Sequence, residues 1–181
     1  MMKVILLLTI MVCISWAEDA GVLNDFNADK CQWSYWLAKE ANAEFLHAPT
    51  GGMDSSGALE LKFGNGNSKG ACFLKHFPVE PGKRYTSTVW VKGSGLSKNT
   101  QLSLSFQGLD AKKNFLNNGI FSTFKPASEE WQRLILTFLV PDTGKWKEVK
   151  YLICTLGTKP PSAAGSAFFD DFFFTIDEDE E

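Results

Sequence analysis

Two aspartates stand inside the most aromatic segment of the chain. The run 168–172 reads Phe-Phe-Asp-Asp-Phe, which has the composition of a buried strand apart from Asp170 and Asp171. A carboxylate that leaves water costs free energy unless a cation or hydrogen-bond donors compensate it. Asp170 therefore indicates either a bound cation or a set of N–H groups or a lysine around it. Alternation along a strand predicts that Asp170 points inward with Phe168, Phe172 and Phe174, and that Asp171 meets solvent.

A second chemical feature is a tryptophan among hydroxyl and amide side chains. In a strand over 85–92, Trp90 shares one face with Thr86, Thr88 and Lys92. A hairpin loop over 93–99 would then place Trp90 on the same sheet face as Ser103, with Thr88 near Ser105 and Thr86 near Gln107. An aromatic ring covers the apolar face of a sugar, and amides hydrogen-bond its hydroxyls. This face predicts a saccharide site with Trp90 as the platform, and the alternative is a Trp90 covered by a loop or by the N-terminal segment.

Other side chains are candidates for the same site. Gln101 and Gln107 are expected to supply its hydrogen-bonding groups. Tyr151 is expected to face the polar side as a second ring, because Leu152, Cys154 and Leu156 face inward. Trp33 and Trp36 could wall the site from the N-terminal segment. Trp146, between two lysines after Gly144, is expected to be an exposed loop aromatic and an edge-site candidate, since loops vary function on a fixed scaffold.

The elements that must position these residues are strands. Apolar residues alternate with polar ones in three clear sets, which are Leu59, Leu61 and Phe63; Leu102, Leu104 and Phe106; and Leu134, Leu136, Phe138 and Val140. Gly-, Asn- and Pro-rich turns separate such runs. About ten short strands at this spacing predict an all-β protein, an antiparallel β-sandwich of the jelly-roll type.

The two ends of the chain are expected to lie outside this sandwich. Residues 1–17 have a positive start, an apolar run and a Ser-Trp-Ala site, which predicts a signal peptide cleaved after Ala17. The apolar run is roughly half of the 18 residues that a membrane span needs, so no membrane insertion is expected. One module then covers residues 18–176, and residues 177–181 form an acidic, solvated tail. The chain is predicted to be secreted or periplasmic.

Charge and cysteine content exclude some classes of function. The formal net charge is −3 and no basic stripe occurs, which argues against nucleic-acid binding. Cys31, Cys72 and Cys154 follow the signal segment; a Cys31–Cys72 disulfide is the more plausible bridge, and Cys154 is expected as a buried thiol. His47 and His76 have no companions at zinc-ligand spacing.

Enzymatic motifs are missing from the sequence. It contains no Gly-x-Ser-x-Gly elbow, no phosphate-binding loop and no pair of core-strand carboxylates suited to glycoside hydrolysis. The chain is therefore expected not to be an enzyme.

Five motifs in order give the chain a resemblance to a known family. They are Leu23-Asn24-Asp25-Phe26, Asp54-Ser55-Ser56-Gly57-Ala58-Leu59, Pro81-Gly82-Lys83-Arg84-Tyr85, Trp131-Gln132-Arg133-Leu134 with Phe138, and Asp170-Asp171-Phe172. The chain resembles carbohydrate-binding modules of families four and nine, of galactose-binding-domain-like jelly-roll fold, over residues 23–176. The resemblance implies a non-catalytic module that binds a poly- or oligosaccharide on a sheet face or in edge loops. The alternative is a structural or protein-interaction β-sandwich of the cell envelope with a protein partner and no sugar binding.

The resemblance also implies a structural Ca²⁺ ion and a partner enzyme. Such modules commonly hold calcium where the N-terminal segment meets the last strand, and carboxylate and amide oxygens suit this ion. Asp170 is expected as the main ligand, with Asp54 and Asn27 as lesser ones. The family usually has an acidic residue at the position of Asn27, so a neutral amide weakens the site. Because such modules normally accompany a catalytic domain, a glycoside hydrolase on another chain is an expected associate.

Overall fold

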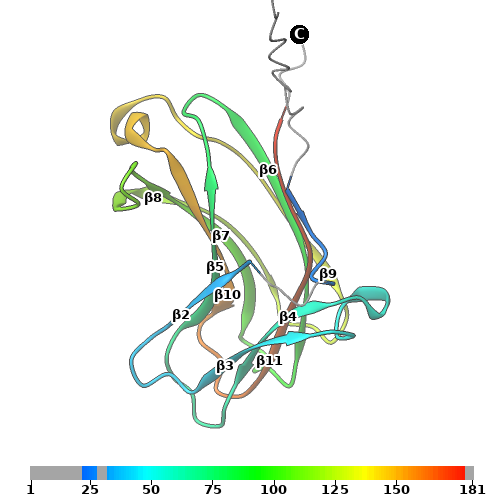
Figure 1. Cartoon of the computed structure of the whole chain (residues 1–181). Helices are drawn as coiled ribbons and strands as arrows, with labels where there is room; N and C mark the ends of the chain where they lie inside the picture. Colours follow the sequence, from blue (N-terminus) through cyan, green and yellow to red (C-terminus); the bar gives the residue numbers. More distant parts are fainter. Residues whose placement is uncertain (1–21, 28–31, 178–181) are drawn as a thin grey trace, which may run out of the picture.

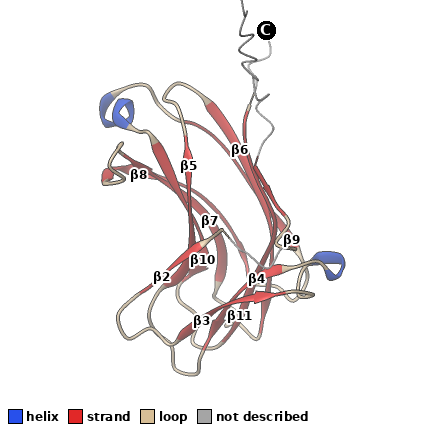
Figure 2. Ribbon diagram, viewed as in Figure 1, coloured by secondary structure: helices blue, strands red, loops and turns tan. Residues whose placement is uncertain are grey.

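The computed structural model describes residues 22–27 and 32–177, which form strands joined by turns and two short 3-10 helices (Figures 1 and 2). In chain order the elements are β1 (Val22–Asn24), β2 (Ser34–Leu37), β3 (Ala43–Ala48), η1 (Met53–Ser55), β4 (Ala58–Phe63), β5 (Ala71–Pro78), β6 (Arg84–Ser94), β7 (Gln101–Leu109), β8 (Phe115–Pro126), β9 (Gln132–Leu139), η2 (Gly144–Glu148), β10 (Tyr151–Lys159) and β11 (Gly165–Ile176). The predicted signal peptide, the acidic residues 178–181 and Cys31 lie outside the described residues. Within the described part, no helix has the length and apolar character to cross a bilayer.

The strands form two antiparallel sheets that face each other. Sheet A has the order β3-β4-β11-β6-β9, and β1 also pairs with β11. Sheet B has the order β2-β5-β10-β7-β8. The two layers are visible as the two curved walls of the ribbon in Figure 2. The predicted all-β antiparallel sandwich is therefore confirmed.

The inner faces of the two sheets meet in one aromatic core. Phe106 of sheet B lies 5.2 Å from Phe138 and 5.4 Å from Phe174 of sheet A, measured between ring centroids. Phe77 lies 4.6 Å from Phe174 and 5.5 Å from Phe172. The predicted inward sets in β4 and β7 are fully or almost fully buried, as are Leu134, Phe138 and Val140 around β9. Side chains at alternate positions in these strands consequently point outward.

Strand β11 is interrupted by a β-bulge, which changes the predicted placement of Asp170. The register with β6 shifts between Asp170 and Phe173, and Asp171 has a φ of 46°. An extra residue in one strand reverses the side-chain alternation beyond it. Phe172 and Phe174 thus face the core, whereas Asp170 pairs with Trp90 on the outer side of sheet A. The prediction that Asp170 shares its face with Phe172 and Phe174 is wrong, because the bulge between them reverses the alternation of side chains along the strand.

Removing the ring of Phe172 should destabilise the fold far more than removing that of Phe168. Phe172 is fully buried, 5.0 Å from the ring of Trp33, whereas Phe168 is half-buried on the outer side of sheet A. Phe172→Ala leaves a cavity and should lower the free energy of unfolding by about 3–5 kcal/mol. Urea denaturation of both variants measures the difference, and equal losses would contradict the described core.

Candidate functional site

The predicted neighbours of Trp90 are wrong because β6 and β7 belong to different sheets. Trp90 pairs with Arg133 of β9 and Asp170 of β11, and its half-buried ring lies on the outer side of sheet A. The segment after Ser94 crosses to sheet B, where β7 pairs with β10 and β8. Ser103, Ser105 and Gln107 therefore lie on the other sheet from Trp90.

The outer face of sheet B instead brings small and polar side chains together between two aromatic rings. Strand pairing aligns five residues in one row across the sheet, here called the floor row: Trp36, Cys72, Gly157, Ser103 and Phe124. Trp36 is 51% exposed at one edge, and Phe124 is 51% exposed at the other. Four strand spacings separate them, which is about 19 Å. Because the three residues between them are small, the floor row forms a shallow strip of surface with an aromatic ring at each end.

Hydroxyl groups line the next row along the strands. This row contains Ser34, Leu74, Thr155, Ser105 and Ser122. Ser105 is 5% exposed, and its Oγ has no hydrogen-bond partner within the described structure. A buried hydroxyl without a partner is costly, and this one is enclosed by its neighbours in the sheet. Ser103, by contrast, already donates to the Gly157 carbonyl at 3.2 Å.

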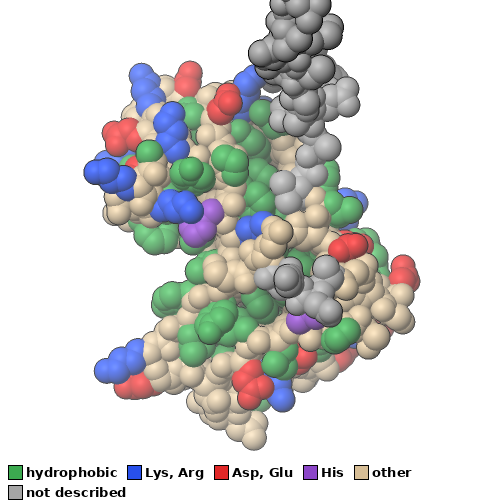
Figure 3. Space-filling view, in the orientation of Figure 1, with side chains coloured by type: hydrophobic (Ala, Val, Ile, Leu, Met, Phe, Trp, Pro, Cys, Tyr) green, Lys and Arg blue, Asp and Glu red, His purple; other side chains and the backbone are tan. Residues whose placement is uncertain are grey.

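Gln107 and Tyr151, two of the predicted site residues, lie on the part of this face that is farther from the floor row. Gln107 pairs with Ile153 and Ile120, and Tyr151 lies one row beyond. A pocket of about 260 Å³ opens here, lined by Gln107, Gly108, Phe115, Asn117, Asn118, Gly119 and Ile120. Asn117, Asn118 and Gly119 lie within β8, where the pairing with β7 shifts register. Figure 3 shows the molecule hollowed between the part that carries the end of β8 and the part that carries β2.

Tyr151, Gln101, Gln107 and Trp36 thus share the outer face of sheet B, which we call the groove face. Gln101 pairs with Lys159 in the row beyond the floor row, opposite the Tyr151 side. Sequence reasoning missed Phe124, Ser34 and Thr155 on this face. The alternation of β8 could have indicated Phe124, but the sheet to which β8 belongs could not be read from its own residues.

His76 also lies on the groove face, next to Ile153. Burial, and then the positive charge of Lys113, lower the pKa of its imidazole below the ordinary value. The ring is therefore neutral at neutral pH and has one nitrogen that donates and one that accepts.

Two of the predicted tryptophans are more buried than expected. Trp33 is 8% exposed within the core, packs edge-on against Phe172, and donates from Nε1 to Asn24 Oδ1 at 3.1 Å. Trp146, in η2, is half-buried with its ring 4.8 Å from that of Phe121. The prediction of Trp33 as a site wall is wrong, because its ring is buried in the core. Trp146 is half-buried rather than fully exposed, and its ring lies next to Gly119 of the pocket, so its role at the edge of the site stays a prediction.

The thiols have no catalytic character. Burial raises the pKa of Cys72, in the floor row, to about 11, so its thiol stays protonated and weakly nucleophilic. Cys154 is fully buried, as predicted, and burial raises its pKa well above the ordinary value. Both are free thiols. The predicted partner of Cys72, Cys31, lies outside the described residues.

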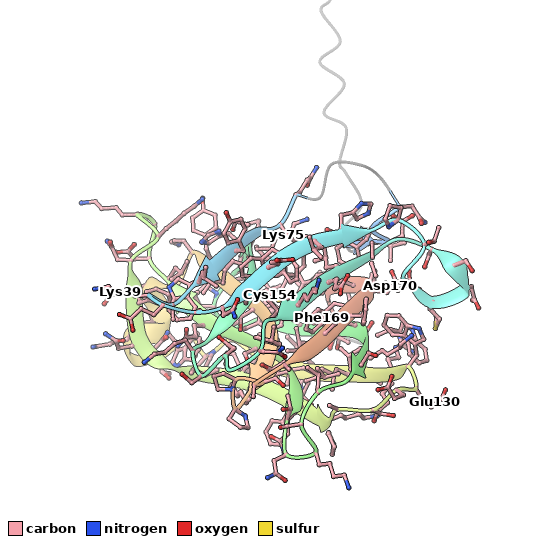
Figure 4. All side chains as sticks on the ribbon, turned by 90° about the horizontal axis from the view of Figure 1, so that it is seen from below. Lys39, Lys75, Glu130, Cys154, Phe169 and Asp170 are labelled. Carbon is pink, nitrogen blue, oxygen red and sulfur yellow. The ribbon has the colours of Figure 1, made fainter. Side chains whose placement is uncertain are left out.

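The carboxylate of Asp170 is fully buried under the loop that contains η1 (Figure 4). Its Oδ2 accepts hydrogen bonds from the Met53 N–H at 2.8 Å and the Ser56 hydroxyl at 2.6 Å. Its Oδ1 accepts one from the Asp171 N–H at 2.7 Å. The loop can approach this closely because a side chain at Gly52 would overlap the carboxylate. N–H and O–H donors therefore compensate this buried charge.

The other predicted calcium ligands are not gathered around Asp170 as a ligand set. Asn27 is exposed, and its Oδ1 accepts a hydrogen bond from the Gly57 N–H at 2.8 Å. Asp54 is exposed in η1. Within residues 22–27 and 32–177, no three His, Cys, Asp or Glu side chains are grouped so that they could hold a metal ion. In the described conformation these three side chains do not fit a calcium site.

Comparison with known proteins gives one family and a shared fold. A family model described as a carbohydrate binding domain matches residues 21–158. None of the curated proteins compared matches the chain. Three examples of similar solved structures show the shared fold. The enzymatically active domain of bacteriophage CBA120 tailspike protein 4 is 15% identical over 84% of this chain, with a TM-score of 0.65. The CBM22-1–GH10 modules of Clostridium thermocellum xylanase 10B, complexed with xylohexaose, are 16% identical over 90%, with a TM-score of 0.62.

The third structure, TmCBM61 in complex with β-1,4-galactotriose, is 15% identical over 81% of this chain, with a TM-score of 0.52. The match covers 89% of TmCBM61, but only 20% of the tailspike chain and 29% of the xylanase chain. At these identities the likeness shows the fold. The chain thus spans well under a third of the first two proteins.

Ionisation of Asp171 should destabilise the folded protein. Burial first, and then the negative charges of Asp170, Asp25 and Asp54, raise the pKa of its carboxyl group. A raised pKa in the folded state means that stability is greatest below the ordinary pKa and falls as pH rises through the raised one. Asp171→Asn, in chelator, should therefore raise the unfolding midpoint at pH 7 and leave it unchanged near pH 3. Asparagine also tolerates the left-handed backbone at this position.

The exposed Asp142, in the turn after β9, provides the control. Asp142→Asn should leave the midpoint unchanged across the same pH series. An Asp171→Asn protein that melts below the wild type at pH 7 would contradict the stated cause of the shift.

Proposed function

Because the chain belongs to the carbohydrate-binding domain family, whose model matches residues 21–158, we propose that it binds an oligo- or polysaccharide along the groove face without acting on it chemically. The observation that carries the proposal is the floor row, a track of small side chains about 19 Å long with Trp36 and Phe124 at its ends.

The groove face offers the two kinds of contact that a sugar requires. Exposed rings at the edges can lie against the C–H faces of sugar units, and their burial releases water from apolar surface. Between them, the hydroxyl of Thr155 and the amide of Gln107 can pair with sugar hydroxyls.

Catalysis is not part of this proposal. Glycoside hydrolysis needs two carboxyl groups roughly 5–9.5 Å apart across the bound sugar. On the groove face, as far as the structure describes it, the outward positions of the five strands hold neither Asp nor Glu. A glycoside hydrolase associated with this module would supply the chemistry, as the GH10 module of the similar xylanase structure illustrates for that protein.

The proposal places the chain outside the cytoplasm, either secreted or periplasmic. Its support is the sequence of residues 1–17, with a positive start, an apolar run and small residues before the expected cleavage after Ala17. A polysaccharide ligand is consistent with such a location.

A calcium ion near η1 is a separate part of the proposal. Its support is the gathering of negative charge: Asp25, Asp54 and Asp170 all lie close enough to Asp171 to raise the pKa of its carboxyl group. A divalent cation would relieve this repulsion, and oxygen ligands suit Ca²⁺. Since donors of the protein already occupy Asp170 and Asn27, binding would require the loop around η1 to rearrange.

Replacing Trp36 should weaken saccharide binding, whereas replacing Trp90 should not. Trp36→Ala removes an exposed ring at the end of the floor row and should lower affinity at least about tenfold, which corresponds to about 1.4 kcal/mol. Retention of residues 18–181 on a panel of polysaccharides is the measurement, with folding matched by circular dichroism. Trp90→Ala, on sheet A, is the matched control. Loss of binding in Trp90→Ala together with full retention in Trp36→Ala would contradict the assigned face.

Calcium should raise the thermal midpoint if the ion stabilises the fold. A ligand at a hundredfold excess over its dissociation constant adds about 2.7 kcal/mol to the free energy of unfolding. The midpoint is measured in calcium chloride and in EDTA, for the wild type and for Asp170→Asn. The ion should raise only the wild-type midpoint. Equal wild-type midpoints in both solutions would count against a bound ion.

A further inference from the structure

The groove face is free of acidic side chains in a chain that is acidic as a whole. The sequence holds 21 Asp and Glu residues against 18 Lys and Arg, yet none of the acidic residues occupies an outward position on the described strands of sheet B. Two lysines and one histidine stand at its borders instead. In Figure 3 the upper rim of the hollow carries basic and histidine side chains.

Lys159 borders the floor row on one side. It pairs with Gln101 in the row next to Gly157 and Ser103, and its side chain is exposed. Lys113 borders the face on the other side, where its Nζ lies 5.4 Å from the centre of the Tyr151 ring. Because Tyr151 lies on the groove face, this contact places the ammonium group of Lys113 at the border of that face.

Neither lysine is neutralised by a carboxylate of the protein. Among the described residues, Lys159 and Lys113 form no side-chain ion pair, in contrast to Lys62, which lies 3.9 Å from Glu44 on sheet A. Asp110, the acidic residue nearest to Lys113 in sequence, accepts hydrogen bonds from the backbone N–H groups of Lys112 and Asn114 and from the Asn114 amide. The borders of the groove thus present two uncompensated positive charges.

We propose that the groove takes an anionic saccharide, in which carboxylate or sulfate groups on the sugar units pair with Lys159 and Lys113. This inference rests on the proposed function and names the ligand class of the same site. Opposite charges on ligand and protein favour association, and a like charge on the face would oppose it. Lys159 lies one row from the floor row, whereas Lys113 lies at Tyr151, about 20 Å from Gly157 along β10, so a saccharide that pairs with both lysines extends from the floor row across the groove face. Acid groups at such exposed borders keep part of their hydration, so the preference should weaken as salt increases.

The test compares ligands that share a backbone and differ only in charge. Affinity electrophoresis or calorimetry is run with polygalacturonate against its methyl ester, and with chondroitin sulfate against desulfated, carboxyl-methylated chondroitin. The expected result is at least tenfold tighter binding of one acidic form than of its neutral counterpart. Chondroitin that has lost its sulfate groups but keeps its carboxylates is measured as well, and it distinguishes a carboxylate ligand from a sulfated one.

Lysine variants then assign the preference to the groove. Lys159→Gln combined with Lys113→Gln should reduce the preference for the acidic form to less than threefold while leaving the circular dichroism spectrum unchanged. Lys62→Gln combined with Lys92→Gln, both on sheet A, also removes two positive charges and should leave the preference intact. A preference that this sheet A variant weakens as much as the groove variant would overturn the inference, because general attraction to net charge would then explain it.

Failure of the inference can be told from failure of the proposed function. If neutral and acidic forms bind equally well and Trp36→Ala weakens both, the groove binds saccharide and the anionic class is wrong. If a full panel of neutral and acidic polysaccharides shows no binding, the proposed function itself is wrong and the inference fails with it.

Discussion

The packing of the two inner faces against each other is the constraint on which the rest of the structure depends. Phe106, Phe77, Phe138, Phe174 and Phe172 occupy the space between the sheets, and each belongs to a strand whose register they help to hold. A register shift of one residue would move all inward-facing side chains of a strand to the outer face of its sheet. A buried face therefore specifies the register strongly. The outward positions follow from the same register. The floor row is therefore set by side chains that never touch a ligand.

Sheet order is the second determinant of the site. The floor row needs β2, β5, β10, β7 and β8 side by side, although these strands come from every part of the chain. Because β6 and β7 lie in opposite sheets, a run of polar residues on β6 contributes nothing to a site on β7. The loops next to sheet B determine which side chains border the groove. One of them is the turn between β7 and β8, which carries Lys113.

Much of the fold could be predicted from the sequence, and the reasons are local. Alternation in β4, β7 and β9 marks one buried face without reference to any partner strand, so those inward sets are correct. The orientations of Tyr151, Gln101 and Gln107 follow from the same alternation. Pairing between strands is not local, and Trp90 was therefore assigned to the wrong sheet. Trp33 and Trp146 stand among polar residues in the sequence, which suggests exposed rings. Both rings instead pack at the ends of the core, and only the packed structure reveals these contacts. The bulge at Asp171 likewise leaves no mark in the alternation.

The central claim is that saccharide binds across the outer face of sheet B. The most direct test is a titration of isotope-labelled protein with a bound oligosaccharide, followed by amide and indole NMR shifts. The account predicts shifts at the Trp36 indole and at the amides of Gly157, Ser103 and Ser105, with the Trp90 indole unchanged. Shifts confined to Trp90 and its neighbours on sheet A would contradict it.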